Sequence, residues 1–419
     1  MVSAQIRYNP LTLQRQSSLA VFMLAFALLL AGMAAPVLKA ETLAVQDRQL
    51  PGERAVQMGT RWTVIPSLKL DAATLIGPLS GEAFYTNHYE RELNFFTPKM
   101  TPEVRIAIRE IMDTRRKMGG SPAPAWVANI ISAWPGEDLT SFRMAVADPM
   151  GLEERLKATD FYSNRTWQAW MSLRPQLRTY LNWLDMIGYE KYWTDWIEPV
   201  VTSKSKDAQK YLAPFDVVTE VQKVLGRPLS GNELTVYVLY FNRPQGIRMT
   251  GTRYITNVRW SLATTARIAG HELLHPPYPG PKGHELSALF GILKSDPYLM
   301  ALLRNRNPVE GYNNFNSFVG ENIVQALDQV VSERLGIAED PVERWSRHVQ
   351  GTQQVLATTL YSLMIQQGFM SGRETAHEFF TRILTDGSLK PGDIAVQHAW
   401  FLSGNVRPEP LQANTVNEN

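Results

Sequence analysis

The segment SLATTARIAGHELLH, residues 261–275, decides how this chain is interpreted. Ser261 is a favoured N-cap residue, and the two prolines that follow His275 cannot continue a helix, so the segment predicts a helix over 262–275. His271 and His275 are four residues apart and therefore lie on one helix face, where two imidazoles can bind one Zn²⁺ ion. Glu272 lies next to the first histidine, as the general base does in HExxH metal hydrolases.

A catalytic zinc ion needs three protein ligands and one open position. The best candidate for the third ligand is Glu321, near the start of a helix predicted over 315–335, because a second helix packed across the first would complete a His₂Glu site. Four other side chains remain open as the third ligand: His284, Glu285, Glu310 and Glu333.

Two short segments resemble the paired zinc motifs of gluzincins, the metallopeptidases that combine HExxH with a downstream glutamate. They are GHELLH, residues 270–275, and GENI, residues 320–323, of which the second is similar to the neprilysin-type GENIAD. The resemblance implies a zinc metallopeptidase with His271, His275 and Glu321 as ligands. Where that pattern places Asp four residues after the ligand Glu, to hold a zinc-bound imidazole, this chain has Gln325. Asp328, about one turn further on the same face, is the alternative partner for that imidazole.

The expected chemistry is hydrolysis of a peptide bond by a zinc-activated water, with Glu272 as general base. A further group should stabilise the oxyanion of the tetrahedral intermediate. Four side chains are candidates for this role and cannot be separated by sequence: Tyr278, Tyr312, His348 and His377.

The pattern predicts an α+β fold, predominantly helical, with a zincin-like catalytic region in which a small β-sheet precedes the HExxH helix. Strands are expected over 61–66, with possible continuation to 76, over 233–241 and over 246–257, where residues 250–257 would offer an edge to an extended peptide. Helices are expected from Pro102 to the glycines at 119 and 120, over 166–201 with breaks at Pro175 and Gly188, and over 284–294, 297–304 and 315–335. The predicted organisation is a signal peptide (1–40), a mainly helical region (41–230), the catalytic region (231–403) and a disordered tail (404–419).

The first 40 residues are typical of an export signal. Arg7 and Arg15 precede an apolar run over 18–35, and Ala40 is a candidate cleavage site; an uncleaved membrane anchor is the alternative. The chain has no Cys, which excludes disulfides and thiolate ligands and fits a bacterial periplasm. Localisation is therefore expected to be periplasmic or secreted.

Charge argues against nucleic acid as a partner. The whole chain has a formal net charge of +2, but segment 1–40 contains three basic residues and no acidic residue. The remaining residues therefore include 39 basic and 40 acidic side chains and have a net charge of −1. No basic stripe is evident. The expected partner is a peptide or protein substrate, with membrane contact only if the N-terminal segment is retained, and the oligomeric state is not determined by the sequence.

The predicted function is that of a zinc metallopeptidase of the cell envelope. One alternative is a non-catalytic zincin scaffold that binds a partner, and another is a zinc hydrolase of peptidoglycan cross-links. The aromatic residues at helical spacing between Trp167 and Trp196 are typical of a helix core, and a stacking platform for sugars is the alternative.

Overall fold

Four strands form one small mixed sheet in the order β1-β2-β4-β3. Their bounds are Arg61–Ile65 for β1, Glu233–Leu239 for β2, Ile247–Arg248 for β3 and Arg253–Asn257 for β4. β1 and β4 each pair in parallel with β2, whereas β3 is antiparallel to β4. The sheet therefore joins a strand from near residue 60 to strands that follow residue 230.

A computed structural model describes residues 59–118, 122–159, 161–229, 231–244, 246–275, 288–306, 314–347 and 354–405. The predicted signal segment 1–40 and most of the predicted tail lie outside these ranges. Within the described residues, no helix is long and apolar enough to cross a membrane.

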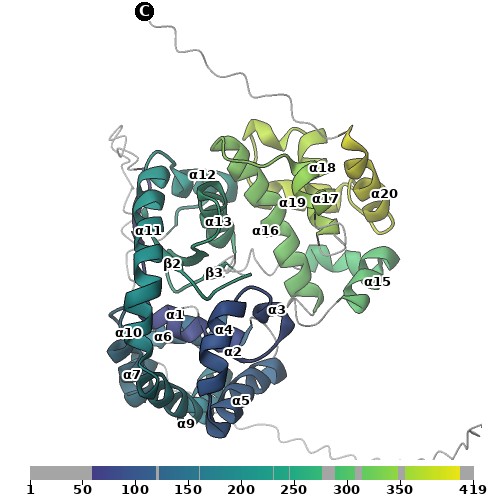
Figure 1. The fold of residues 1–419 in the computed structure, drawn as a ribbon. Helices are drawn as coiled ribbons and strands as arrows, with labels where there is room; N and C mark the ends of the chain where they lie inside the picture. Colours follow the sequence, from purple (N-terminus) through teal and green to yellow (C-terminus); the bar gives the residue numbers. More distant parts are fainter. Residues whose placement is uncertain are drawn as a thin grey trace, which may run out of the picture. The chain divides into compact units, whose positions relative to one another are not determined.

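Most of the described chain is helical (Figure 1). The helices between β1 and β2 are α1 (Leu68–Thr74), α2 (Ile76–Leu79), α3 (Ala83–Thr86), α4 (Glu90–Phe96), α5 (Pro102–Met118), α6 (Ala123–Ile131), α7 (Leu139–Ala147), α8 (Pro149–Lys157), α9 (Asn164–Met186), α10 (Tyr189–Tyr192), α11 (Glu198–Leu212) and α12 (Val217–Leu225), with a 3₁₀ turn η1 (Thr97–Lys99) and a π-helical segment η2 (Trp193–Ile197). Those after the sheet are α13 (Leu262–Leu274), α15 (Pro297–Asn305), α16 (Phe315–Arg334), α17 (Pro341–Arg347), α18 (Val355–Gln366), α19 (Ala376–Thr385) and α20 (Asp393–Trp400), with the shorter segments η3 (Gly291–Ser295), η5 (Phe369–Ser371) and η6 (Phe401–Asn405).

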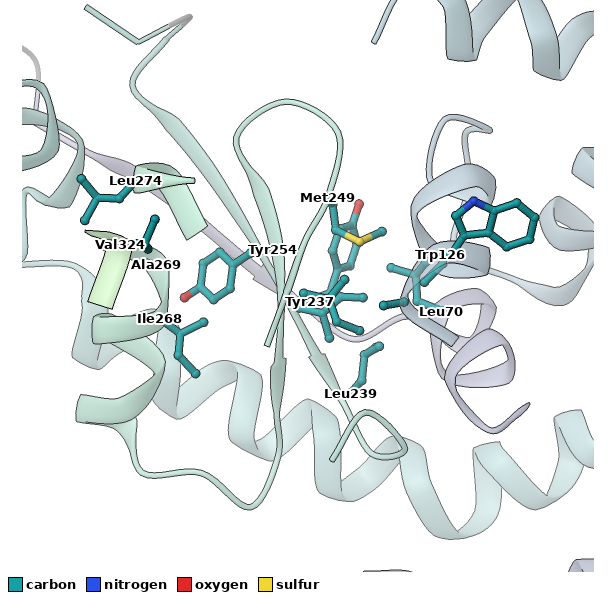
Figure 2. Close-up of a cluster of buried hydrophobic side chains, with 14 of the residues drawn as sticks. Leu70, Trp126, Tyr237, Leu239, Met249, Tyr254, Ile268, Ala269, Leu274 and Val324 are labelled. Carbon is teal, nitrogen blue, oxygen red and sulfur yellow. The ribbon is translucent and has the colours of Figure 1, made fainter. Parts of the chain in front are cut away.

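Helices cover both faces of the sheet, and the core lies on either side of it (Figure 2). On one face, Tyr254 of β4 lies toward Ile268 and Ala269 of α13. On the other, Tyr237 of β2 lies toward the helices that carry Leu70 and Trp126. β2 is buried almost throughout, as a central strand covered on both faces must be. α13 packs in turn against α16, and α16 against α18, so the segment 262–275 lies between the sheet and the C-terminal helices.

The prediction of a predominantly helical α+β protein is confirmed for the described residues. The continuation of the first strand to residue 76 is wrong, because α1 starts at Leu68. The Ser67 hydroxyl caps α1 by accepting the Leu70 backbone N–H. Two polar residues of α1, Lys69 and Asp71, are buried and hydrogen-bonded.

The strand predicted over 246–257 is two strands, β3 and β4, separated by a turn in which Gly251 has φ of 70°. β4 is consequently flanked by β2 and β3, so Tyr254 and Ile255 are paired on both sides, and the strand at that edge of the sheet is β3. The helix break expected at Pro175 is also absent, because α9 continues through it. Buried residues on both sides of this proline, Trp170 and Leu177 among them, hold α9 against its neighbours and outweigh the roughly 3 kcal/mol that proline costs in a helix. The break at Gly188 is present, with φ of 67°.

Candidate metal centre

The HExxH segment forms the C-terminal end of α13. The helix starts with the Ser261 hydroxyl accepting the Thr264 backbone N–H and ends at Leu274, because His275 has extended backbone angles (φ −63°, ψ 140°) as expected before a proline. His271 and Glu272 are buried, at 8% and 7% exposure. The motif therefore lies inside the protein, at a point where the helix stops.

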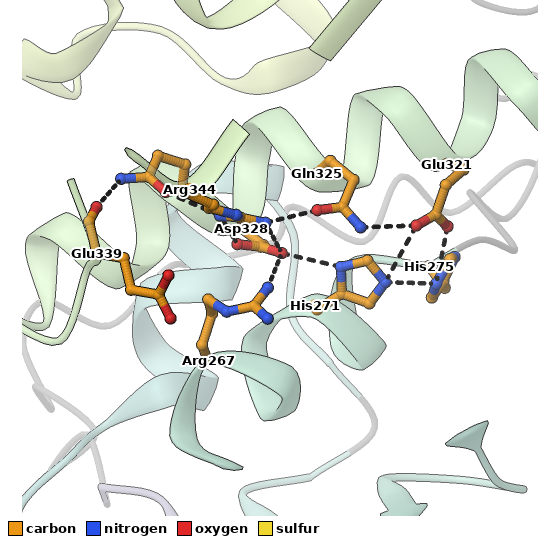
Figure 3. A network of polar contacts seen from close by, with 9 residues as sticks. Arg267, His271, His275, Glu321, Gln325, Asp328, Glu339 and Arg344 are labelled. Atoms are coloured by element: carbon orange, nitrogen blue, oxygen red, sulfur yellow. Dashed lines mark hydrogen bonds and ion pairs between the residues drawn. The ribbon is translucent and has the colours of Figure 1, made fainter. Parts of the chain in front are cut away.

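α16 brings Glu321 to the two histidines (Figure 3). His271 Nε2 is 3.7 Å from Glu321 Oε1, His275 Nε2 is 3.6 Å from Glu321 Oε2, and the two Nε2 atoms are 3.1 Å apart. Gly270 allows this approach, because a Cβ at that position would lie 3.2 Å from Val331 Cγ1 on α16. Among the described residues, these three form the group of His, Cys, Asp or Glu side chains able to hold a metal ion.

These separations fit a single tetrahedral zinc ion. Ligand atoms about 2.0–2.2 Å from zinc at tetrahedral angles are roughly 3.3–3.5 Å from one another. Here the two Nε2 atoms are 3.1 Å apart, and each lies 3.6–3.7 Å from one of the two Glu321 oxygens. The donor set, two imidazole nitrogens and one carboxylate, is that of His₂Glu catalytic zinc sites. The residues present therefore fit the metal that the sequence predicted.

Asp328 fixes the orientation of His271. Its Oδ2 lies 2.9 Å from His271 Nδ1, and it also receives hydrogen bonds from Arg267 of α13 and Arg344 of α17. Burial alone would raise the pKa of Asp328, but the two guanidinium groups and His271 hold that pKa well below its usual value. An ionised carboxylate only accepts, so Nδ1 of His271 carries a hydrogen, and Nε2 is the ring nitrogen that faces Glu321 and His275.

Gln325 contacts the ligand glutamate instead of a histidine. Its Nε2 donates to Glu321 Oε1 at 2.8 Å, and its Oε1 accepts from Arg344 at 2.5 Å. The position at which the gluzincin pattern has Asp is thus occupied by a residue that orients the carboxylate ligand. Asp328, three residues later, contacts the imidazole.

Glu272 lies against the sheet beside β3. Its carboxylate accepts the backbone N–H of Arg248, and a Cβ on Gly246 would lie 3.0 Å from its Oε1. Burial raises the pKa of Glu272 to about 7, while the nearby His271 and Arg248 oppose the rise. A carboxylate with a pKa near neutrality is suited to accept and return a proton.

The two histidines have opposite pKa shifts. Burial lowers the pKa of His271, but Glu321 and the hydrogen bond to Asp328 raise it more, so the net shift is upward. Burial and the neighbouring His271 lower the pKa of His275 to about 4. His275 is therefore neutral, and its imidazole can act as a ligand, at physiological pH.

The other candidates named from sequence do not join this group in the described chain. Glu333 lies twelve residues further along α16, where it accepts from Tyr361 and Gln329. His377 lies in α19, which packs against α12. The remaining ligand and oxyanion candidates lie outside the described residues: Tyr278, His284, Glu285, Glu310, Tyr312 and His348.

Sequence reasoning missed Arg267 and Arg344. Arg267 had a usable signal, since it precedes His271 by four residues and so lies on the same face of α13. Arg344 had none, because α17 reaches the site through tertiary packing.

Most aromatic residues of the 167–196 series belong to the core, as the sequence suggested. Those exposed by 5% or less are Trp170, Tyr180, Trp183, Tyr189 and Trp193. Trp196 differs, at 59% exposure.

The site must be interpreted from its own geometry, because no family model, no curated protein and no solved structure matches this chain.

Proposed function

We propose that this chain is a zinc-dependent metallopeptidase that binds one zinc ion through His271, His275 and Glu321. The observation that carries the proposal is the convergence of these three side chains, from the end of α13 and from α16, with their donor atoms within 4.8 Å of one another and Glu272 beside them. A zinc ion held by these groups would polarise the scissile carbonyl and bring the pKa of a coordinated water to roughly 7.

Glu272 has the role of general base in this proposal. It accepts the proton of the attacking water and passes it to the leaving amine, for which its raised pKa of about 7 is suited. Asp328 keeps His271 in the tautomer that can bind a metal. β3, the antiparallel strand at the sheet edge next to Glu272, supports a zincin-like catalytic region and is the strand with which an extended substrate can pair.

The cellular setting in this proposal is the bacterial envelope, with the periplasm or the exterior as the location. It rests on the basic and apolar segments of residues 1–40 and on the absence of Cys.

The first experiment is metal analysis of the purified protein beside Glu321→Ala, His271→Ala and Glu333→Ala. We expect about one zinc per chain in the wild type, loss of zinc in the first two variants and retention in the third, whose glutamate is on the same helix but away from the site. Unchanged zinc in Glu321→Ala would move the third ligand to another residue. Absence of zinc uptake by the wild type would refute the metal site.

Activity is then measured on casein and on purified peptidoglycan sacculi in parallel. Cleavage of casein supports the peptidase proposal, whereas release of fragments from sacculi alone would assign the hydrolysis to cross-links. No zinc-dependent cleavage of either substrate would contradict a catalytic role.

A further inference from the structure

Arg344 connects α17 to the metal centre through two separate side chains. Its NH1 and NH2 donate to Oδ1 and Oδ2 of Asp328 at 2.7 and 2.9 Å, and NH2 also donates to Gln325 Oε1 at 2.5 Å (Figure 3). The Arg344 side chain is only 5% exposed. A buried, planar guanidinium with a two-pronged contact is held in one orientation, which is the property needed to orient other groups.

The contact with Gln325 determines which way its amide points. A guanidinium only donates hydrogen bonds, so the Gln325 oxygen must face Arg344 and its NH₂ group must face away. The group that it then meets is the Glu321 carboxylate, which accepts at Oε1 over 2.8 Å. Oε2 of the same carboxylate lies on the side of His275, at 3.6 Å from Nε2. Arg344 therefore sets the rotation of a ligand that it does not touch.

The contact between Arg344 and Asp328 sets the orientation of His271 in a similar way. With both carboxylate oxygens held by Arg344, Oδ2 receives the Nδ1–H of His271 at 2.9 Å. The hydrogen on Nδ1 leaves the Nε2 lone pair for a metal ion.

We infer that Arg344 is a positioning residue of the metal site, acting on Glu321 through Gln325 and on His271 through Asp328. The inference rests on the proposed function, since it treats Glu321 and His271 as zinc ligands. It makes zinc affinity depend on a residue of α17, a helix that supplies no ligand among those assigned here.

Arg267 provides the matched comparison. It also contacts Asp328, but through NH1 alone, at 3.1 Å, and no contact links it to Gln325. Lysine at either position keeps the positive charge and loses the planar fork. Arg344→Lys thus loses the fork that contacts Asp328 and Gln325 at the same time, whereas Arg267→Lys weakens only support for Asp328.

The test measures zinc affinity of the full chain by competition with a chromophoric chelator. The proteins are the wild type, Arg344→Lys, Arg267→Lys, Gln325→Met and the double variant Arg344→Lys/Gln325→Met. We expect Arg344→Lys to bind zinc about 10–100-fold more weakly, as is usual when the partners of metal ligands are lost. Zinc affinity should fall less in Gln325→Met than in Arg344→Lys, and less again in Arg267→Lys. The affinity loss of the double variant should be smaller than the product of the losses in its two single variants, because both changes act on Glu321.

A second readout separates positioning from general destabilisation. The Co²⁺-substituted proteins should show changed visible absorption in Arg344→Lys and in Gln325→Met, since the orientation of the carboxylate ligand changes, while Arg267→Lys keeps the wild-type spectrum. Circular dichroism of the metal-free proteins checks folding. Gln325 is half-buried, so Gln325→Met keeps the test open if Arg344→Lys does not fold.

Wild-type affinity and spectrum in Arg344→Lys or in Gln325→Met would overturn the inference. Equal losses in Arg344→Lys and Arg267→Lys, with Gln325→Met unchanged, would also overturn it and leave only the charge around Asp328. A wild type that binds no zinc would instead refute the proposed function, and this outcome is distinguishable because it appears before any variant is compared.

Discussion

His271 Nδ1 donates to Asp328 Oδ2 over 2.9 Å, and Asp328 lies seven residues along α16 from Glu321. Seven residues are about two helical turns, so Glu321 and Asp328 lie on the same face of α16. One helix therefore supplies a proposed metal ligand, Glu321, and also the group that orients a second proposed ligand, His271 of α13. A shift of α16 relative to α13 would displace both together, which makes the packing between these helices part of the site.

Glu272→Gln should retain zinc and lose hydrolysis. Glutamine has nearly the same shape as glutamate and can still accept the backbone N–H of Arg248, but its amide cannot take a proton from water. Loss of a general base lowers the rate by about 10²–10⁴-fold. Metal analysis and a peptidase assay on one preparation are the measurements; activity near the wild-type level with zinc bound would reject Glu272 as the base.

Gly246→Ala should displace the Glu272 carboxylate and leave zinc binding unchanged. The new methyl group would lie 3.0 Å from Glu272 Oε1 and 3.0 Å from Ile268 Cγ2, so the carboxylate must move. The required shift is a few tenths of an ångström, and because misplacement of a catalytic group by about 1 Å can cost roughly 100-fold, we expect a decrease in kcat of up to about 10-fold with zinc content unchanged. Gly291→Ala is the control, because a Cβ there meets no atom within 4 Å. Equal activity of the two variants would show that this contact does not position Glu272.

The candidate ligand set could be proposed from two short sequence patterns, although the two segments meet only through the packing of α13 against α16. A four-residue spacing on one helix defines the pair of histidines, and a short segment around Glu321 has the pattern of a second zinc motif. The end of α13 was equally predictable, since proline prevents helical angles at His275.

Of the polar groups behind the proposed ligands, Arg344 could not be predicted, because α17 reaches the site through tertiary packing. Asp328 does contact His271, as the alternative drawn from sequence expected, whereas the contact of Gln325 with Glu321 and Arg344 was not foreseen. The possible continuation of the first strand to residue 76 failed for a related reason. Lys69 and Asp71 of α1 are buried with partners far along the chain, at Trp134 and Tyr240, which the local sequence does not show.

The two glycines of the paired motifs should respond differently to alanine. At Gly270 the new Cβ would lie 3.2 Å from Val331 Cγ1, so the Val331 side chain must give way by a few tenths of an ångström, and this overpacking should offset the helix-propensity gain of alanine. At Gly320, also within a helix, the Cβ meets no atom within 4 Å, and alanine should stabilise by about 0.5–1 kcal/mol through helix propensity. Urea unfolding of the metal-free proteins tests the contrast. Similar free energies of unfolding for both variants would mean that Gly270 is not needed for the approach of α13 to α16.

Asp71 should make the stability of the protein depend on pH, away from the metal site. Its Oδ1 accepts the backbone N–H groups of Tyr240 and Phe241, at the end of β2, and its Oδ2 accepts the indole N–H of Trp193. Complete burial raises the pKa of Asp71 to about 7, although these three donors oppose the rise. In the unfolded chain an aspartate has a pKa of about 3.9.

Between these two values the folded state holds a proton that the unfolded state has released. The free energy of unfolding should therefore decrease as pH rises from about 4 to about 7, by up to about 1.4 kcal/mol per pH unit, and become level above that range. Asp71→Asn cannot ionise, so its unfolding free energy should lack this decrease, and the difference between the two proteins should change with pH in that window. Urea unfolding of metal-free wild type and variant at several pH values between 4 and 8 measures it. Parallel curves would contradict the prediction, because they would mean that the three N–H donors keep Asp71 ionised in the folded protein.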